Sequence, residues 1–285
     1  MVMYMLSPYL MQALLAASIA SVVTAVVGCF TVLRGLSSMG AAIAHTALAG
    51  AVAGYLAGAP PYIGGAIAAA LFSLAVADIG LKEKGRMETI IGMSFGFTTA
   101  IAVLLIAMTS EYMVVAWRFL VGDVLGVSMR EVSVLALATA ATISAIALAY
   151  KELKFITFDF EVAEAMGLNV RLYHYLMLTL IALASAVCLR VVGSILTVVF
   201  LVAPAAAAYQ LTHTLERMML LSVAFSLASA TAGVLLAVPL NLPPSALGGV
   251  IASLLYFTSV AYSYKARVCE KCARQFRIAK EGVPR

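Results

Sequence analysis

The amino-acid sequence predicts an all-α protein that crosses a membrane about nine times. Of its 285 residues, 64% are hydrophobic and only 11% are charged, whereas a soluble domain carries roughly 25% charged residues. Its apolar runs are long enough to cross a bilayer as helices, and short polar connections separate them. We expect the spans at approximately 9–33, 40–58, 62–81, 89–109, 131–150, 172–190, 194–212, 217–237 and 244–263.

Basic residues predict the orientation of these spans, because loops on the cytoplasmic side are enriched in Lys and Arg. They gather in the loop at 82–86, in the loop at 151–171 and in the tail at 264–285. Nine spans place all three on one side, so we expect a cytoplasmic C-terminus and an N-terminus outside. The tail holds seven basic and two acidic residues and accounts for the net charge of +5. We expect this tail to hold the C-terminus on the cytoplasmic side of the lipid bilayer. No nucleic-acid partner is expected.

The chain divides into a transmembrane domain at 1–263 and a basic tail at 264–285. Two connections are longer than the helices need. The segment 110–130 is amphipathic and contains the single Trp, which fits either an interfacial helix or a re-entrant piece. The segment 151–171 is the most charged internal stretch and predicts a short helix over Phe160–Met166 that ends at Gly167. That helix is either a solvated loop element or a docking element for a cytoplasmic partner.

His45 is the most informative single residue. It lies inside a run of small and apolar residues, where an ionisable group is costly and marks a functional candidate. Histidine is also the commonest metal ligand. The alternative is a histidine near a helix end that bonds a backbone carbonyl. The other histidines, His174 and His213, fall at predicted span ends and are expected to be interfacial caps.

Four cysteines divide into two pairs. Cys29 and Cys188 lie in apolar runs and are expected to be packing residues. Cys269 and Cys272 form a C-x-x-C in the basic tail. Two thiols fall short of the four ligands of a structural zinc site. Two tails together would supply four, and the alternative is a reduced, unstructured tail.

Motifs for independent chemistry are absent from the sequence. No P-loop occurs, since Gly80–Arg86 lacks the G-K-[ST] ending, and no hydrolase or metalloprotease motif occurs. Ion-coupled transporters carry acids at membrane depth. Here almost all acids fall in predicted loops or at a span's first residue, and only Asp78 lies further inside a span, close to its cytoplasmic end. These absences, together with the charged loop, favour a permease that is driven by a separate subunit. We expect no enzyme activity and no bound cofactor in this chain.

Several stretches resemble the permease subunits of the zinc/manganese/iron class of ABC importers, which includes bacterial zinc permeases. The resemblance covers residues 9–263 approximately. It rests on Val32–Gly40 continuing to His45 and Gly50, on Gly122–Leu125, on Phe158–Leu168, on Val192–Gly193, on Val202–Ala206 and on Leu242–Pro244. Each stretch alone is weak, but they occur in the family's order and at matching intervals.

This resemblance implies a homodimer in a prokaryotic plasma membrane, with the metal path at the two-fold axis. Two ATP-binding cassette ATPase subunits would dock from the cytoplasm and hydrolyse ATP, and an extracytoplasmic binding protein would deliver the metal. The loop at 158–168 would be the coupling helix. Its candidate ATPase contacts are Asp159, Glu161, Glu164, Ala165 and Gly167.

The chain departs from the family pattern at position 41. The family places an Asp four residues before the His, so that both side chains share one helix face. Here the residue is Ala41. Two copies of His45 with water would then favour Zn²⁺, with Mn²⁺ or Fe²⁺ as further candidates. Otherwise another oxygen ligand, such as Asp123 from a re-entrant segment, replaces the missing carboxylate, or the substrate differs.

Two alternative functions stay open at this level. A permease of similar architecture for a metal chelate or a cobalamin-like substrate would have a wide polar vestibule. A membrane scaffold or metal sensor would use the C-x-x-C tail and leave the match at 158–168 unexplained.

Overall fold

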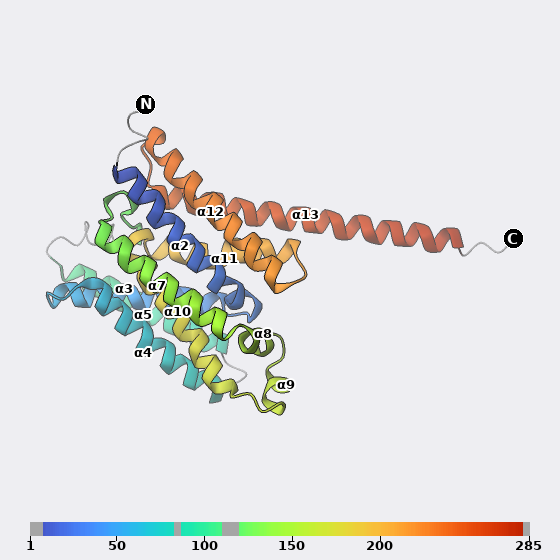
Figure 1. Ribbon diagram of the computed structural model, residues 1–285, viewed down its shortest axis with the longest axis horizontal. Coiled ribbons are helices and arrows are strands. Elements are labelled where there is room, and N and C mark those ends of the chain that lie inside the picture. The colour runs from blue at the N-terminus through green and yellow to red at the C-terminus, as the bar shows by residue number, and fades with distance from the viewer. Residues whose placement is uncertain (1–7, 83–86, 110–119, 282–285) are drawn as a thin grey trace.

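A computed structural model shows a bundle of long helices joined by short connections (Figure 1). The structure describes the backbone of 8–82, 87–109 and 120–281, and side chains there except at 8, 80–82, 87–88, 190 and 264–281. Its helices are α2 (Pro8–Leu33), α3 (Ser37–Leu56), α4 (Pro61–Lys82), α5 (Met87–Ala107), η1 (Val124–Gly126), α7 (Met129–Leu148), α8 (Tyr150–Phe158), α9 (Phe160–Ala165), α10 (Val170–Val192), α11 (Ser194–Leu211), α12 (Leu215–Leu240) and α13 (Pro244–Glu281).

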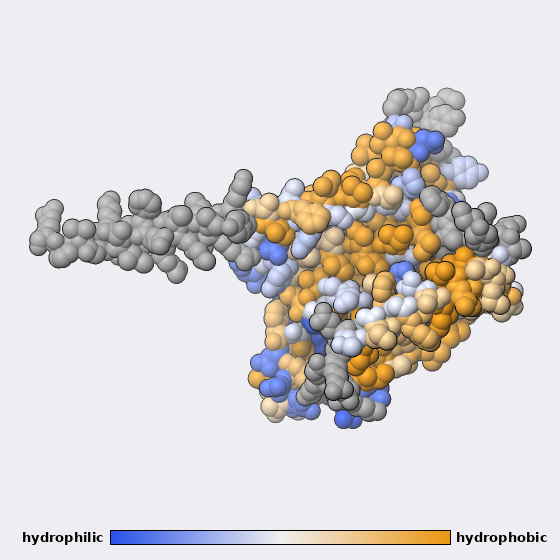
Figure 2. Space-filling model, turned by 180° about the vertical axis from the view of Figure 1, so that it is seen from behind, coloured by the Kyte–Doolittle hydropathy of each residue, from blue (hydrophilic) through white to orange (hydrophobic). Residues whose placement is uncertain are grey.

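Nine helices of the described chain are long and apolar enough to cross a membrane, as the sequence predicts. Their ends differ from the predicted ends by a few residues. Figure 2 shows hydrophobic side chains across the middle of one face and hydrophilic ones towards its edges. Helix α13 continues past the end of its span into the basic tail, and it projects from the bundle in Figure 1.

Helix boundaries follow local chemistry. Pro8, Pro61 and Pro244 each occupy the first position of a helix, where the missing N–H costs nothing. Helix α7 begins with a capping box, in which Ser128 and Glu131 satisfy each other's backbone N–H groups. Asn241 ends α12 in the left-handed conformation at φ 52°, and the prolines that follow start α13.

The core lies around α2, α3, α10 and α11, which are the most buried spans, whereas α4, α5, α7 and α13 are the least buried. Close approach depends on glycine. A Cβ on Gly28 would lie 2.0 Å from the carbonyl oxygen of Leu201, so that α2 and α11 touch through backbone. Small residues permit such close contacts. In a membrane these contacts matter because the hydrophobic effect does not drive helices together in lipid.

The charged connection forms two helices rather than one. Helix α8 precedes the predicted helix, and Asp159 ends α8 and begins α9. Helix α9 ends beside Gly167 at φ +83°, as predicted. A small core of Ile156, Ala163 and Val170 holds α8, α9 and the start of α10 together, separate from the main core.

Candidate functional site

Helix α3 is fixed by direct contact with its neighbours. A Cβ on Gly50 would lie 2.4 Å from the carbonyl oxygen of Gly64 on α4, and a Cβ on Gly40 would lie 2.2 Å from the Leu201 side chain on α11. Both distances are too short for a real Cβ. At Gly50 the neighbour is backbone, which cannot move aside, so glycine is required at the α3–α4 crossing, whereas at Gly40 the Leu201 side chain would have to shift. The α3–α4 crossing therefore restricts the position of α3.

One face of α3 is partly exposed. Most side chains in the middle of the helix are buried, whereas Ser38 is exposed and Ala41 and His45 are partly exposed. Their spacing of three and then four residues places them on one helix face. His45 thus lies midway along a membrane helix, on its partly exposed face.

The His45 ring is positioned by packing. It meets the Phe95 ring of α5 edge to face, with centroids 4.8 Å apart and an interplanar angle of 83°. Its Nδ1 is buried and has no hydrogen-bond partner among the residues that the structure describes. The predicted alternative, a bond to a backbone carbonyl, is therefore not seen. A neutral imidazole held in this way retains a lone pair for a metal ion.

A single chain supplies few ligands here. Ala41, one turn before His45, brings no oxygen. Across the ranges that the structure describes, no group of three or more His, Cys, Asp or Glu side chains could hold a metal ion. The site is therefore an open contact point on a helix face rather than a closed cage.

Asp123 has a structural task at one end of the bundle. Its Oδ1 accepts a hydrogen bond from the Gly126 N–H at 3.0 Å and caps η1. The preceding Gly122, at φ +83°, lies against the backbone of Val192 and Gly193. Two stretches that carry the family resemblance thus meet in space. Residues 110–119 lie outside the described part, so re-entry of that segment is not tested.

Helix α9 presents most of the predicted coupling residues to solvent. Glu161, Glu164, Ala165 and Gly167 are exposed. Asp159 is exposed as well, and its Oδ1 accepts from the Val162 N–H at 2.9 Å, which caps the helix. Their contact with an ATPase stays a prediction.

Exposed apolar side chains accompany the charged residues of α9, and the sequence analysis did not identify them. Phe158 at the end of α8, Val162 on α9 and Met166 directly after α9 are 61%, 45% and 71% exposed. Asp159 interrupts the helix between Phe158 and Val162 with an extended backbone, so the four-residue spacing alone does not place these side chains on one helix face. Exposed apolar residues of this kind, flanked by charges, mark a protein-binding surface.

The other histidines behave differently from each other. His174 was expected to be an interfacial cap, but it is 5% exposed, and neither ring nitrogen has a hydrogen-bond partner in the described structure. Arg34 lies beside this face of α10, where its Nη1 donates to the Met177 Sδ at 3.4 Å. His213 is exposed and lines a cavity of about 570 Å³ beside the α11–α12 turn.

The cysteines give two outcomes. Cys29 and Cys188 are buried free thiols, as predicted. Cys269 and Cys272 fall in the part of α13 where only the backbone is described. A metal site in the tail is therefore outside what the structure describes.

Comparisons with known proteins agree on one family. The sequence profile of the ABC 3 transport family matches residues 6–263. The chain is 34% identical to the manganese transport system membrane protein MntC of Halalkalibacterium halodurans, over 96% of this chain and 93% of the relative. It is 33% identical to a probable iron transport system membrane protein of Haemophilus influenzae, over 90% and 94% of the two chains.

A solved structure agrees with the fold. The structure of PsaBC from Streptococcus pneumoniae in complex with Fab contains a chain that superimposes with a TM-score of 0.80 at 29% identity, covering 89% of this chain and 91% of that one.

Proposed function

This chain belongs to the ABC 3 transport family and is a metal-importer permease that crosses the bacterial plasma membrane several times, and we propose that it moves a divalent transition-metal ion past His45. The observation that carries the proposal is the imidazole on the partly exposed face of α3, halfway along the span, whose Nδ1 has no hydrogen-bond partner among the described residues. An ionisable group at that depth is costly unless it has a task. Transit needs weak binding, so an open contact point suits it better than a cage.

Zn²⁺ is the substrate that the ligand chemistry favours. The path offers an imidazole from His45 and no carboxylate at Ala41. Imidazole suits zinc, whereas manganese prefers oxygen ligands. In a two-fold symmetric dimer, two His45 rings with water would complete the coordination.

Mn²⁺ is the second candidate, and a different observation favours it. The relative with 34% identity is named as a manganese transport protein. If Mn²⁺ is the substrate, then water or an oxygen ligand from outside the described residues takes the place of the missing Asp.

The ATPase partner would dock on α9. The exposed apolar side chains of Phe158, Val162 and Met166, at and beside α9, offer contact area, and Glu161 and Glu164 add charge. The basic loops and the basic tail support a cytoplasmic location for this end. ATP hydrolysis would belong to the docked subunit, because this sequence lacks a P-loop. An extracytoplasmic binding protein would then deliver metal at the opposite end, near η1.

A second copy of the chain would cover α5. This span is the least buried of the nine. Gly92 and Gly96, four residues apart on it, have no atom of the described residues within 4 Å of an added Cβ. Such a pair permits close approach of another helix. Because Phe95 of α5 touches His45, a dimer along α5 would bring the two His45 residues towards one axis.

Metal uptake by cells that lack their own importers tests the proposal. The chain would be expressed with its ATPase and binding protein, and uptake of Zn²⁺, Mn²⁺ and Fe²⁺ would be measured in competition. His45→Ala should abolish most uptake. Thr46→Ala is the matched control, because its hydroxyl bonds to the Ala42 carbonyl within α3 and is buried away from the open face. Unchanged uptake by a well-expressed His45→Ala variant would remove His45 from the path.

A further inference from the structure

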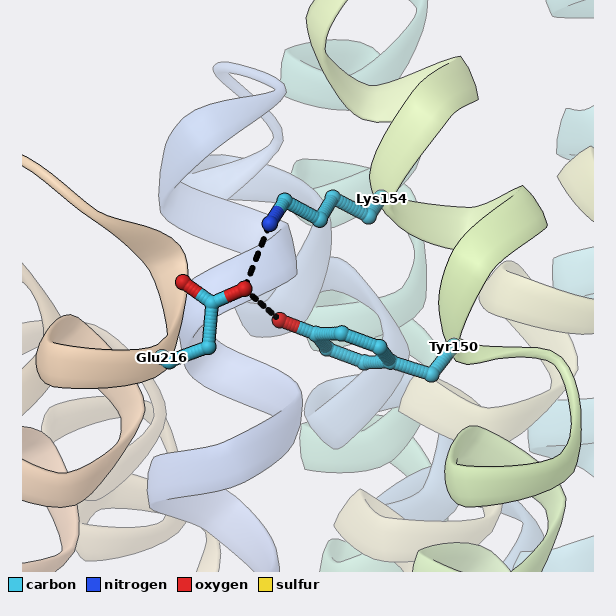
Figure 3. A network of polar contacts seen from close by, with 3 residues as sticks. All are labelled: Tyr150, Lys154 and Glu216. Carbon is cyan, nitrogen blue, oxygen red and sulfur yellow. Dashed lines mark hydrogen bonds and ion pairs between the residues drawn. The ribbon is translucent and has the colours of Figure 1, made fainter.

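Three side chains join α8 to α12 at the α9 end of the bundle (Figure 3). The Oε1 atom of Glu216 accepts a hydrogen bond from the Tyr150 hydroxyl at 2.8 Å, and it also pairs with the Lys154 Nζ. Tyr150 and Lys154 are one turn apart on α8, and Nζ lies 5.8 Å from the centre of the Tyr150 ring. We call these three residues the Glu216 clamp.

The clamp is a direct polar link between α8 and α12. Helix α8 leads into α9 through the shared residue Asp159, and the two share a small core, while Leu153 of α8 reaches the main core. Glu216 belongs to the first turn of α12, directly after the short turn from α11. Helix α11 in turn packs through Leu201 on Gly40 of α3, the helix that carries His45.

A buried leucine beside the clamp on each helix fixes the clamp in place. Leu153 on α8 and Leu215 on α12 are each 2% exposed, so that neither helix can turn without disturbing the core. Two donors from one helix converge on one oxygen of the other. This geometry specifies a single relative position of α8 and α12, which an isolated flexible ion pair would not do.

Stability is an insufficient reason for the clamp. The side chains of Lys154 and Glu216 are 39% and 52% exposed, and exposed ion pairs of this kind contribute little to stability. Its value is therefore positional. On the basis of the proposed function, we propose that the Glu216 clamp passes movement of α9, driven by the ATPase, to α12 and α11, so that Tyr150, Lys154 and Glu216 are positioning residues for coupled transport.

The test uses the whole complex of permease, ATPase and binding protein in proteoliposomes, and it measures ATP hydrolysed per metal ion imported. Glu216→Gln keeps an acceptor for Tyr150 but removes the ion pair, and Lys154→Met removes the cation. We expect each variant to raise this ratio several-fold, while the midpoint of thermal unfolding and the amount of bound ATPase stay unchanged. Lys151→Gln, an exposed neighbour on α8 outside the clamp, is the matched control and should leave the ratio unchanged.

The charge-swapped double variant, Lys154→Glu with Glu216→Lys, separates positioning from folding. It should restore a large part of the coupling, because it rebuilds the ion pair in reverse. Unchanged ratios in both single variants would overturn the inference. Loss of ATPase binding and of the thermal midpoint in the single variants, without recovery in the swap, would also overturn it. A wild-type complex without metal uptake would instead overturn the proposed function, and the clamp with it.

Discussion

Helix α3 and the α8–α9 unit are held by different kinds of contact. At Gly50, α3 lies against the Gly64 backbone of α4 at a distance that excludes a Cβ. The α8–α9 unit is attached through side chains: Leu153 in the main core, the small separate core, and the Glu216 clamp. The first region offers its imidazole on a fixed frame, whereas the second is exposed, charged and rimmed with apolar residues.

The difference fits the two tasks of a transporter. A residue on the metal path, such as His45, must keep its position relative to the same residue of the second copy. Packed membrane helices hold it there. A docking element must follow a partner, and elements with few buried contacts move most easily. The two regions should therefore respond differently to substitution, and the following predictions test that contrast.

The largest effect is expected at the α3–α4 crossing. Gly50→Ala places a Cβ 2.3 Å from the Ala68 Cβ, and overpacking of this kind costs about 1–3 kcal/mol. Thermal unfolding of the purified permease in detergent should show a clear loss of stability. Gly92→Ala, where nothing lies within 4 Å, should leave the midpoint unchanged. Equal midpoints for the two variants would mean that α3 is not locked by backbone contact.

The cap of α9 should give the next largest effect, and it should alter docking rather than the membrane bundle. Asp159→Ala removes the acceptor for the Val162 N–H, and loss of such a cap costs about 1 kcal/mol. Helix α9 should fray, so that less ATPase co-purifies while the main thermal transition stays in place. Asp159→Asn keeps a capping oxygen and should retain binding. Weaker binding by the Asn variant as well would point to a direct role of the charge.

A smaller effect is expected on α3 when the missing carboxylate is restored. Ala41→Asp places an oxygen ligand one turn from His45, on the accessible face. Manganese prefers oxygen ligands more strongly than zinc does, so the ratio of Mn²⁺ to Zn²⁺ uptake should rise several-fold. Competition uptake with both metals measures it, with Ala41→Asn as the uncharged control. An unaltered ratio would count against the ligand argument for zinc.

The smallest effect is expected from pH at the clamp. Burial, and then the Glu216 carboxylate, raise the pKa of Tyr150 to about 12, above its ordinary value of about 10. A raised pKa means that the contribution of Tyr150 to stability is complete below pH 10 and is lost between pH 10 and 12. The difference in thermal midpoint between wild type and Tyr150→Phe should therefore stay constant from pH 6 to pH 9. A difference that shrinks within this range would show that Tyr150 ionises earlier.

Local chemistry made much of the fold predictable. The nine spans follow from hydrophobic length, and α9 follows from a charged run that ends at Gly167. His45 was identifiable because an ionisable side chain stands out in an apolar helix. The exposed apolar side chains of Phe158, Val162 and Met166 were not predictable from their spacing, because the helix is interrupted at Asp159, between the first two.

Other structural features depend on contacts between residues that are far apart in the sequence, and local sequence patterns do not predict such contacts. Gly122 and Gly193 are ordinary turn glycines in the sequence, and only the fold brings their backbones together. His174 falls at a predicted span end, but the packing of α10 buries it. The partners of Glu216 lie 62 and 66 residues away along the chain. Such contacts arise from how helices cross, which single-helix periodicity does not encode.

By itself, the sequence determined that this protein is a polytopic helical membrane protein, because hydrophobic length and charge position act within each segment. It also determined which residue stands out in the membrane and that no carboxylate accompanies it at position 41. The position of His45 on a partly exposed face beside Phe95, and the link from α8 to α12 through one carboxylate, depend on the folded arrangement of the helices. The physical reason is that exposure and pairing are properties of two surfaces in contact, and one of those surfaces always comes from elsewhere in the chain.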